Sequence, residues 1–442
     1  MMNLAVAKNE TRPALSDHFA VARGRLPGSG QVADARRQAF EAYERTGLPH
    51  RRIEDWKYTD LRVLMREVLP LAPEPDAAGL KRAGAALDLH AIPGVRRLVL
   101  VDGVFAPKLS ETAKLEKGLR VRTLREVLEA GDTGFQPQLL ASGSTDPMVA
   151  LNSAMMTDGL VIEVADGTAL AQPLHIIHIA SGGKPAAMFT RSLLAVGKTA
   201  SATLVESYIA ADGATAYQVH DSLAISIGDG ARLDHVRLIE DHREAFNISS
   251  SWVTLGARAH FNTFGMTTGS NVSRYQATIA FAGEGSRVET NGVNLLNGRQ
   301  HADSTLFLDH AVPNCASREI FRSVLDDRGH SVFQGRIIVR PHAQKTDAKM
   351  MTRALLLSDE AEADNKPELE IFADDVTCGH GATTGALDES LLFYLRARGL
   401  SEKEAQALLI QAFVGEAIES IASDALRDLA ISAAERWLAA RG

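Results

Sequence analysis

The chain has 442 residues, of which 45% are hydrophobic and 23% are charged, the composition of a soluble globular protein with two or three domains. Its net charge of −8 argues against nucleic-acid binding, which requires a basic surface. No apolar run approaches the roughly 18 residues that cross a membrane, and the N-terminus lacks the features of a signal peptide. Two cysteines are too few for a disulfide scaffold, so we expect a cytoplasmic protein.

The first region, residues 1–145, is predicted to be mostly helical. Residues 34–46 are rich in helix formers and are followed by glycine and proline, which end a helix. Residues 98–101 predict a strand that leads through an Asp-Gly turn into a second strand. Thr123 is placed to cap a short helix, with Glu126 in the capping-box position.

The second region, residues 146–387, is predicted to be a β-solenoid core. After a short helical segment it contains brief runs rich in β-branched residues, such as 160–164, separated by turn signals. Similar glycine-led steps recur every 26 to 33 residues, at Gly197, Gly230, Gly256 and Gly285. A repeat of this length without intervening helices favours stacked strands. A β-sandwich is the alternative, although so long a series of regular units is unusual for that fold.

The third region, residues 388–442, is predicted to be helical. A first helix ends at Gly399, and Ser401 with Glu404 forms a capping box for a second helix. The second helix carries an apolar stripe at i, i+3, i+4 spacing, interrupted only by Glu416, that comprises Ala405, Leu408, Leu409, Ala412, Phe413 and Ala417. This stripe can pack against the chain's own β region or receive another protein.

Cys378 and His380 are the strongest candidates for chemistry. If their segment is a strand, residues two apart project to the same face, so the thiol and the imidazole lie side by side. Thiolate and imidazole are suitable ligands for iron, zinc or copper. Two ligands do not complete a four-coordinate site, so the other donors come from elsewhere. The alternative is a purely structural role, with a buried cysteine beside a hydrogen-bonded histidine.

Several sequence blocks carry a family resemblance. The run 366–399, which contains Cys378 and His380, together with 344–347 and 354–358, resembles the C-terminal core motif of the SufB/SufD family of iron–sulfur cluster assembly proteins. The block Glu-Asp-Trp-Lys-Tyr-Thr-Asp-Leu at 54–61 is similar to the other recurrent signature of that family. The Cys-x-His followed by Gly-Ala-Thr-x-Gly resembles the SufD branch.

The resemblance implies a right-handed parallel β-helix core. It also implies a non-catalytic subunit of the SUF assembly complex, which pairs with SufB through the end of the β-helix and holds the ABC-type ATPase SufC through its C-terminal helices. Cys378 and His380 would then bind iron or a transient iron–sulfur cluster at the SufB interface, with His380 the more important. No Gly-x-x-x-x-Gly-Lys-Ser/Thr loop occurs, so ATP use must come from a partner. A homodimer in the absence of SufB is left open.

Other residues near the pair have weaker claims. Asp374 and Asp375 can act as acidic ligands or orient His380, but a solvated turn pair explains them as well. Cys315 needs no function as a buried thiol. The glycines at 379, 381 and 385 fit a close approach of another chain, or are plain turn residues.

The remaining aromatic and histidine candidates are interpreted as structural. His175 and His178 are three residues apart in a predicted strand, which puts them on opposite faces and argues against a shared site. His301 and His310 lack a carboxylate-rich partner set. Trp56 is interpreted as an aromatic anchor for a helix end rather than part of a ligand-binding surface.

Two alternative functions come from other classes. A solenoid enzyme acting on polysaccharide would need clustered carboxylates and exposed aromatic residues, and the aromatic content is only 5%. A hydrolase with Cys378 as its nucleophile would need a pocket and an oxyanion hole.

Overall fold

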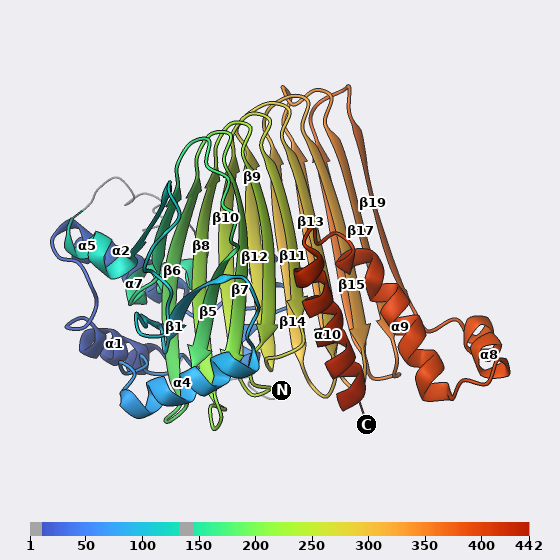
Figure 1. The fold of residues 1–442 in the computed structure, drawn as a ribbon, viewed down its shortest axis with the longest axis horizontal. Helices are drawn as coiled ribbons and strands as arrows, with labels where there is room; N and C mark the ends of the chain where they lie inside the picture. The colour runs from blue at the N-terminus through green and yellow to red at the C-terminus, as the bar shows by residue number, and fades with distance from the viewer. Residues whose placement is uncertain (1–10, 132–144, 442) are drawn as a thin grey trace, which may run out of the picture.

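The computed structural model describes residues 11–131 and 145–441 and shows a mainly β protein. Within these residues the strands form two sheets, one of ten strands and one of nine. Successive core strands alternate between the sheets, so each strand pairs in parallel with the strand two positions later. Figure 1 shows the resulting stack of turns. The architecture is the parallel β-helix that the sequence predicts.

The strands are bounded as follows. The ten-stranded sheet contains, in spatial order, β19 (Thr377–Gly385), β17 (Asp347–Leu356), β15 (Ala316–Leu325), β13 (Arg287–Leu296), β11 (His260–Thr267), β9 (Arg232–Glu240), β7 (Ser201–Ala210), β5 (Leu174–Ala180), β1 (Arg96–Val101) and β2 (Val104–Phe105). The nine-stranded sheet contains β18 (Glu362–Ile371), β16 (His330–Val339), β14 (His301–His310), β12 (Val272–Phe281), β10 (Phe246–Leu255), β8 (Tyr217–Ile227), β6 (Ala186–Val196), β4 (Leu160–Val164) and β3 (Leu119–Thr123).

Strand alternation builds the main core between the two sheets. On β8, for example, Leu223 and Ile225 point inward and are buried. In-register pairing stacks equivalent side chains from turn to turn, since Leu233 pairs with Phe261 and Phe261 with Val288. The fold therefore repeats one small layer of apolar packing along its length.

The predicted glycine repeat lies at the turns between strands. Gly230 and Gly285 adopt positive φ values of 67° and 72°, which favour glycine. At Gly256 the constraint is space, because a Cβ atom there would lie 2.6 Å from a carboxylate oxygen of Asp229 in the preceding turn. The repeat thus marks positions where consecutive turns stack closely.

The N-terminal region supplies helices that cover the first turns. They are α1 (Thr11–Ala22), α2 (Gln31–Thr46), the 3₁₀ helix η1 (Glu54–Trp56), α3 (Leu61–Leu64), α4 (Ala77–Leu89), α5 (Leu124–Glu129) and α7 (Pro147–Met155). The predicted helix at 34–46 lies within α2, and the Thr123–Glu126 capping box of α5 is confirmed. The predicted strand pair is β1 and β2, while β3 extends the other sheet. The boundary at 145/146 remains a prediction.

The C-terminal region is helical, with α8 (Glu389–Ala397), α9 (Glu402–Ile418) and α10 (Asp424–Ala440). Helices α9 and α10 pack on the outer face of the ten-stranded sheet, where Val414 and Trp437 join a buried cluster with Val293 and Val324. Figure 1 shows α8 standing away from the β-helix, and α8 has no buried residue. None of the helices in the described ranges is both long and apolar enough to cross a lipid bilayer.

The predicted stripe of α9 is only partly correct. Ala405 and Ala417 are buried, but Leu408, Ala412 and Glu416 are exposed. The buried face instead includes three further residues, Ile410, Val414 and Ile418. Because apolar residues occur on several sides of this helix, their spacing does not identify the side that meets the sheet. The Ser401–Glu404 capping box is confirmed.

Candidate functional site

The last turn of the β-helix carries Cys378 and His380. Both residues lie on β19, which pairs with β17 and forms one edge of its sheet. Cys378 pairs with Ala348 and His380 with Met350, and these two partners belong to the core between the sheets. The thiol and imidazole therefore project from the same, inward side of the last turn, as their spacing predicts.

The end of the β-helix leaves this pair accessible. Cys378 is partly buried against the core, whereas His380 is exposed. Every residue of β18 and β19 is exposed or only partly buried, in contrast with the strands before them. The pair thus lies at an open rim and is not sealed inside the subunit.

The two side chains act as separate donors. No hydrogen bond joins Cys378 to His380 in the described chain. Burial raises the pKa of the Cys378 thiol, and the carboxylates of Asp347 and Glu319 add to the effect. A raised pKa keeps the sulfur protonated near neutral pH, so an arriving metal ion must displace the proton.

Glu319 lies beneath the pair and was missed from the sequence. It pairs with Met350, which in turn pairs with His380, so the three residues form one inward row across three turns. Glu319 is 1% exposed, and neither of its carboxyl oxygens has a hydrogen-bond partner among the described residues. Burial raises its pKa to about 8. The row is visible only once the register of neighbouring turns is known.

The other candidates from the sequence, Asp374, Asp375 and Cys315, do not form a common site with Cys378 and His380. Asp375 is exposed and forms an ion pair with Lys345, and Asp374 is also exposed. Neither aspartate hydrogen-bonds to His380 in the part of the chain that the structure describes. Cys315 is 1% exposed within the core, where burial raises the pKa of its thiol.

Of the four histidines that the sequence analysis interpreted as structural, three have neighbours that explain their position. His175 bonds to the Ser207 hydroxyl at 2.8 Å, His301 contacts the hydroxyl of Thr59 at 3.0 Å, and His310 stacks on Phe281. His178 points into the interior, where it meets the carboxylates of Glu206 and Asp221. That cluster was not predicted.

The block around Trp56 anchors the N-terminal region to the nine-stranded sheet. The Trp56 ring is 2% exposed, its Nε1 donates to Asp146 at 2.9 Å, and the Arg274 guanidinium lies 3.9 Å from its centroid. Arg274 also forms a buried ion pair with Asp303. The structural interpretation of Trp56 is therefore confirmed.

Comparison with known proteins identifies the family. Residues 178–413 match the model "SUF system FeS cluster assembly, SufBD core domain", and residues 25–176 match "SufBD protein N-terminal region". The chain belongs to the SufBD family. This SufBD chain is 31% identical over 393 residues to an iron–sulfur cluster assembly SufBD family protein of Synechocystis, covering 85% of this chain and 84% of that protein.

Two further relatives have informative names. The iron–sulfur cluster assembly protein SufD of Escherichia coli is 30% identical over 394 residues, covering 88% of this SufBD chain and 89% of the relative. The chloroplastic protein ABCI7 of Arabidopsis thaliana is 25% identical over 395 residues, covering 87% and 82%. The resemblance found in the two sequence blocks thus extends over most of the chain.

Proposed function

We propose that this SufBD protein is a non-catalytic subunit of an iron–sulfur cluster assembly complex with SufB and SufC. In this proposal Cys378 and His380 bind iron or a nascent cluster as cargo, and ligands from SufB complete the coordination. The observation that carries the proposal is the placement of both donors on the inward side of an open last turn. A two-donor site is incomplete within one chain.

The open end supports docking of a SufB β-helix. Strands β18 and β19 are the edges of both sheets, and edge strands offer unpaired backbone groups to another chain. Phe372, which follows β18, is 58% exposed. A Cβ atom added at Gly379 or Gly385 would meet nothing within 4 Å, so this chain itself does not require glycine at either position. Glycine there leaves room for a partner to approach.

Helix α8 supports docking of SufC. Its apolar side chains Leu391, Phe393 and Tyr394 are 51%, 74% and 55% exposed. An isolated helix of nine residues gains little stability by itself, so packing against another protein would favour it. SufC would also supply ATP hydrolysis, and the complex is expected in the cytoplasm without nucleic acid or membrane.

The hydrolase and polysaccharide alternatives are less well supported. A cysteine nucleophile is activated by a lowered pKa or by a neighbouring base. Cys378 has a raised pKa and no hydrogen bond to His380 in the described chain. Two cavities, of about 680 and 570 Å³, are lined by neither Cys378 nor His380, and Tyr217 is the one aromatic residue among the described residues that line them.

The test is reconstitution of cluster assembly with SufB and SufC. His380→Ala is expected to lower the cluster yield strongly and Cys378→Ala to lower it less, while both variants still form the complex. His342→Ala, which changes an exposed histidine near the same end, is the matched control and should behave as the wild type. An unchanged yield with His380→Ala would remove the ligand role.

The SufC contact has a separate test. Replacing Leu391 and Phe393 with serine should abolish co-purification with SufC but leave pairing with SufB intact. Leu408→Ser on α9, where the side chain is 46% exposed, is the control for adding a polar group to a nearby surface. Retained SufC binding in the α8 variant would place the contact on another element.

A further inference from the structure

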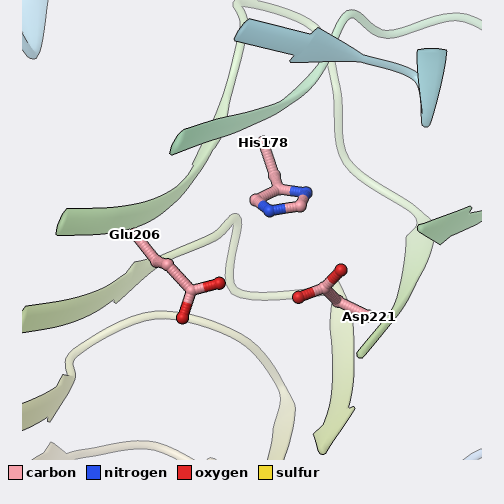
Figure 2. Close-up of side chains that lie close together, drawn as sticks. All are labelled: His178, Glu206 and Asp221. Carbon is pink, nitrogen blue, oxygen red and sulfur yellow. The ribbon is translucent and has the colours of Figure 1, made fainter. Parts of the chain in front are cut away.

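The interior of the first turns contains a buried cluster of an imidazole and two carboxylates. His178 from β5, Glu206 from β7 and Asp221 from β8 are each at most 5% exposed. One ligand atom from each lies within 4.8 Å of the others. Figure 2 shows both carboxylates pointing toward the space beside the His178 ring.

The His178 ring is held in place but has no polar partner. Tyr208 lies opposite His178 in the register of β5 and β7, and the two rings stack with centroids 4.5 Å apart. Neither ring nitrogen of His178 forms a hydrogen bond within residues 11–131 and 145–441. The ring is thus oriented by stacking while both of its nitrogens remain available to a ligand.

The two carboxylates have hydrogen-bond partners, but no arginine or lysine of the described residues forms an ion pair with either of them. The Tyr208 hydroxyl faces Asp221 at 2.8 Å and Glu206 at 3.4 Å, but it has only one proton to donate. Glu206 has one further partner, because its Oε2 lies 2.9 Å from Nε2 of His235.

The nearest fixed cation does not neutralise these carboxylates directly. Arg237 is stacked between the rings of Tyr208 and Tyr275, 4.5 and 4.6 Å from their centroids, and donates to Asn247 and Ser249. No arginine or lysine in the described chain forms an ion pair with Glu206 or Asp221. Two buried carboxylates therefore converge with an imidazole that makes no hydrogen bond, and of the two carboxylates only Glu206 has a basic partner, His235, among the described residues.

We propose that His178, Glu206 and Asp221 form a binding site for a divalent first-row transition metal ion such as Zn²⁺, Fe²⁺ or Mn²⁺. One imidazole nitrogen and two carboxylates form a ligand set that these ions accept, whereas Mg²⁺ and Ca²⁺ prefer oxygen alone. A dication would offset both negative charges, and His178 would bind through a nitrogen that has no other partner. The Tyr208 hydroxyl and Thr190, which bonds to Asp221, would orient the carboxylates from outside.

A side cavity approaches the cluster from the surface. This cavity, of about 570 Å³, is lined by Ala180, Met188 and Tyr217. Ala180 follows His178 by two positions and lies on the same face of β5, and Met188 precedes Thr190 by two positions on the same face of β6. The cavity therefore ends one side-chain layer from the cluster. Its rim includes the carboxylates of Asp76 and Asp102, which attract cations.

The test measures Zn²⁺ bound to the full-length chain in a Cys378→Ala/His380→Ala background, which removes the donors of the proposed assembly site. After chelator treatment and titration with Zn²⁺, we expect one ion per chain and X-ray absorption that reports nitrogen and oxygen ligands without sulfur. Zn²⁺ should also raise the Tm, since a ligand that binds only the folded state stabilises it. Failure of this site and failure of the assembly site are thus distinguishable.

Ligand variants in the same background identify the site. Glu206→Gln and Asp221→Asn preserve side-chain volume and should weaken Zn²⁺ binding at least about 10-fold, because even groups outside the ligand shell are worth that much. His175→Gln, three residues from His178 but on the opposite strand face, should bind as the parent does. The proposal is overturned if the parent binds no Zn²⁺, or if folded Glu206→Gln and Asp221→Asn bind it unchanged.

Discussion

The covered turns and the last turn of this β-helix are built from the same repeat, but they differ in how completely other parts of the chain bury them. Between β4 and β17, neighbouring strands pair on both sides, and helices cover much of the outer faces. The N-terminal end is closed by the antiparallel strands β2 and β3. At the other end, β18 and β19 have no fully buried residue. The chain thus completes one end by itself and leaves the other open, so equivalent substitutions in the two places are expected to have unequal effects on stability.

The largest contrast is expected at a buried ion pair of the covered turns. Arg274→Met leaves Asp303 buried and unpaired, which should lower the free energy of unfolding by about 3–5 kcal/mol. Urea unfolding monitored by circular dichroism measures this loss. The double variant Arg274→Met/Asp303→Leu should recover part of it, because no buried charge then remains. Equal stability of the single and double variants would contradict this account.

Core truncation tests the same contrast with apolar residues. Ile337 on β16 is fully buried, while its register neighbour Leu369 on β18 is only partly buried. Ile337→Ala should cost about 2–5 kcal/mol of unfolding free energy, and Leu369→Ala about 1 kcal/mol. Urea unfolding of both variants checks the difference. Similar losses would mean that the last turn is as well packed as the turns before it.

Glu319 makes stability depend on pH at the boundary between the two regions. Its pKa is about 8 in the folded chain against 4.5 for the free side chain, so the folded state holds an extra proton between these values. The contribution of Glu319 to the free energy of unfolding is therefore at its maximum below pH 4.5. It is lost as the pH rises toward 8, by up to about 1.4 kcal/mol per pH unit. Glu319→Gln should flatten the pH profile of unfolding. Glu289→Gln, at an exposed position, should leave it unchanged.

The smallest effect is expected at an ion pair of the open end. Lys345 and Asp375 are 63% and 65% exposed, so water screens their attraction. Lys345→Met should change the unfolding free energy by less than about 1 kcal/mol. Thermal or urea unfolding at low and high salt measures it. A loss comparable with that of Arg274→Met would show that the last turn depends on its own surface charges.

Much of the fold was predictable from local patterns. The glycine steps gave the solenoid, and the capping boxes at Thr123 and Ser401 located two helix starts. The placement of Cys378 and His380 on one face of their strand followed from strand alternation alone, whereas the inward direction of that face did not. The buried side of α9 could not be predicted, because the sheet that selects Ile410 and Val414 lies about 100 residues earlier in sequence, a distance of the kind that only tertiary structure bridges.

The cluster of His178, Glu206 and Asp221 could not be predicted from residue spacing, for a different reason. The register of β5 and β7 pairs His178 with Tyr208 and Ile176 with Glu206, so Glu206 lies two positions along the strand from the partner of His178. Asp221 belongs to the opposite sheet, and no periodicity in the sequence indicates which residues of two facing sheets meet. Glu319 was missed in the same way, since its relation to His380 depends on the register of three strands.

Stacking by nearest neighbours has a consequence for how the molecule loosens. Each turn is held by the turns directly before and after it, and the last turn has a neighbour on one side only. Fraying therefore starts at β19 and moves inward one layer at a time, so amide protons there exchange with solvent before those of β13. A subunit that settles on this rim would slow exchange progressively along the stack, well beyond the residues that it touches.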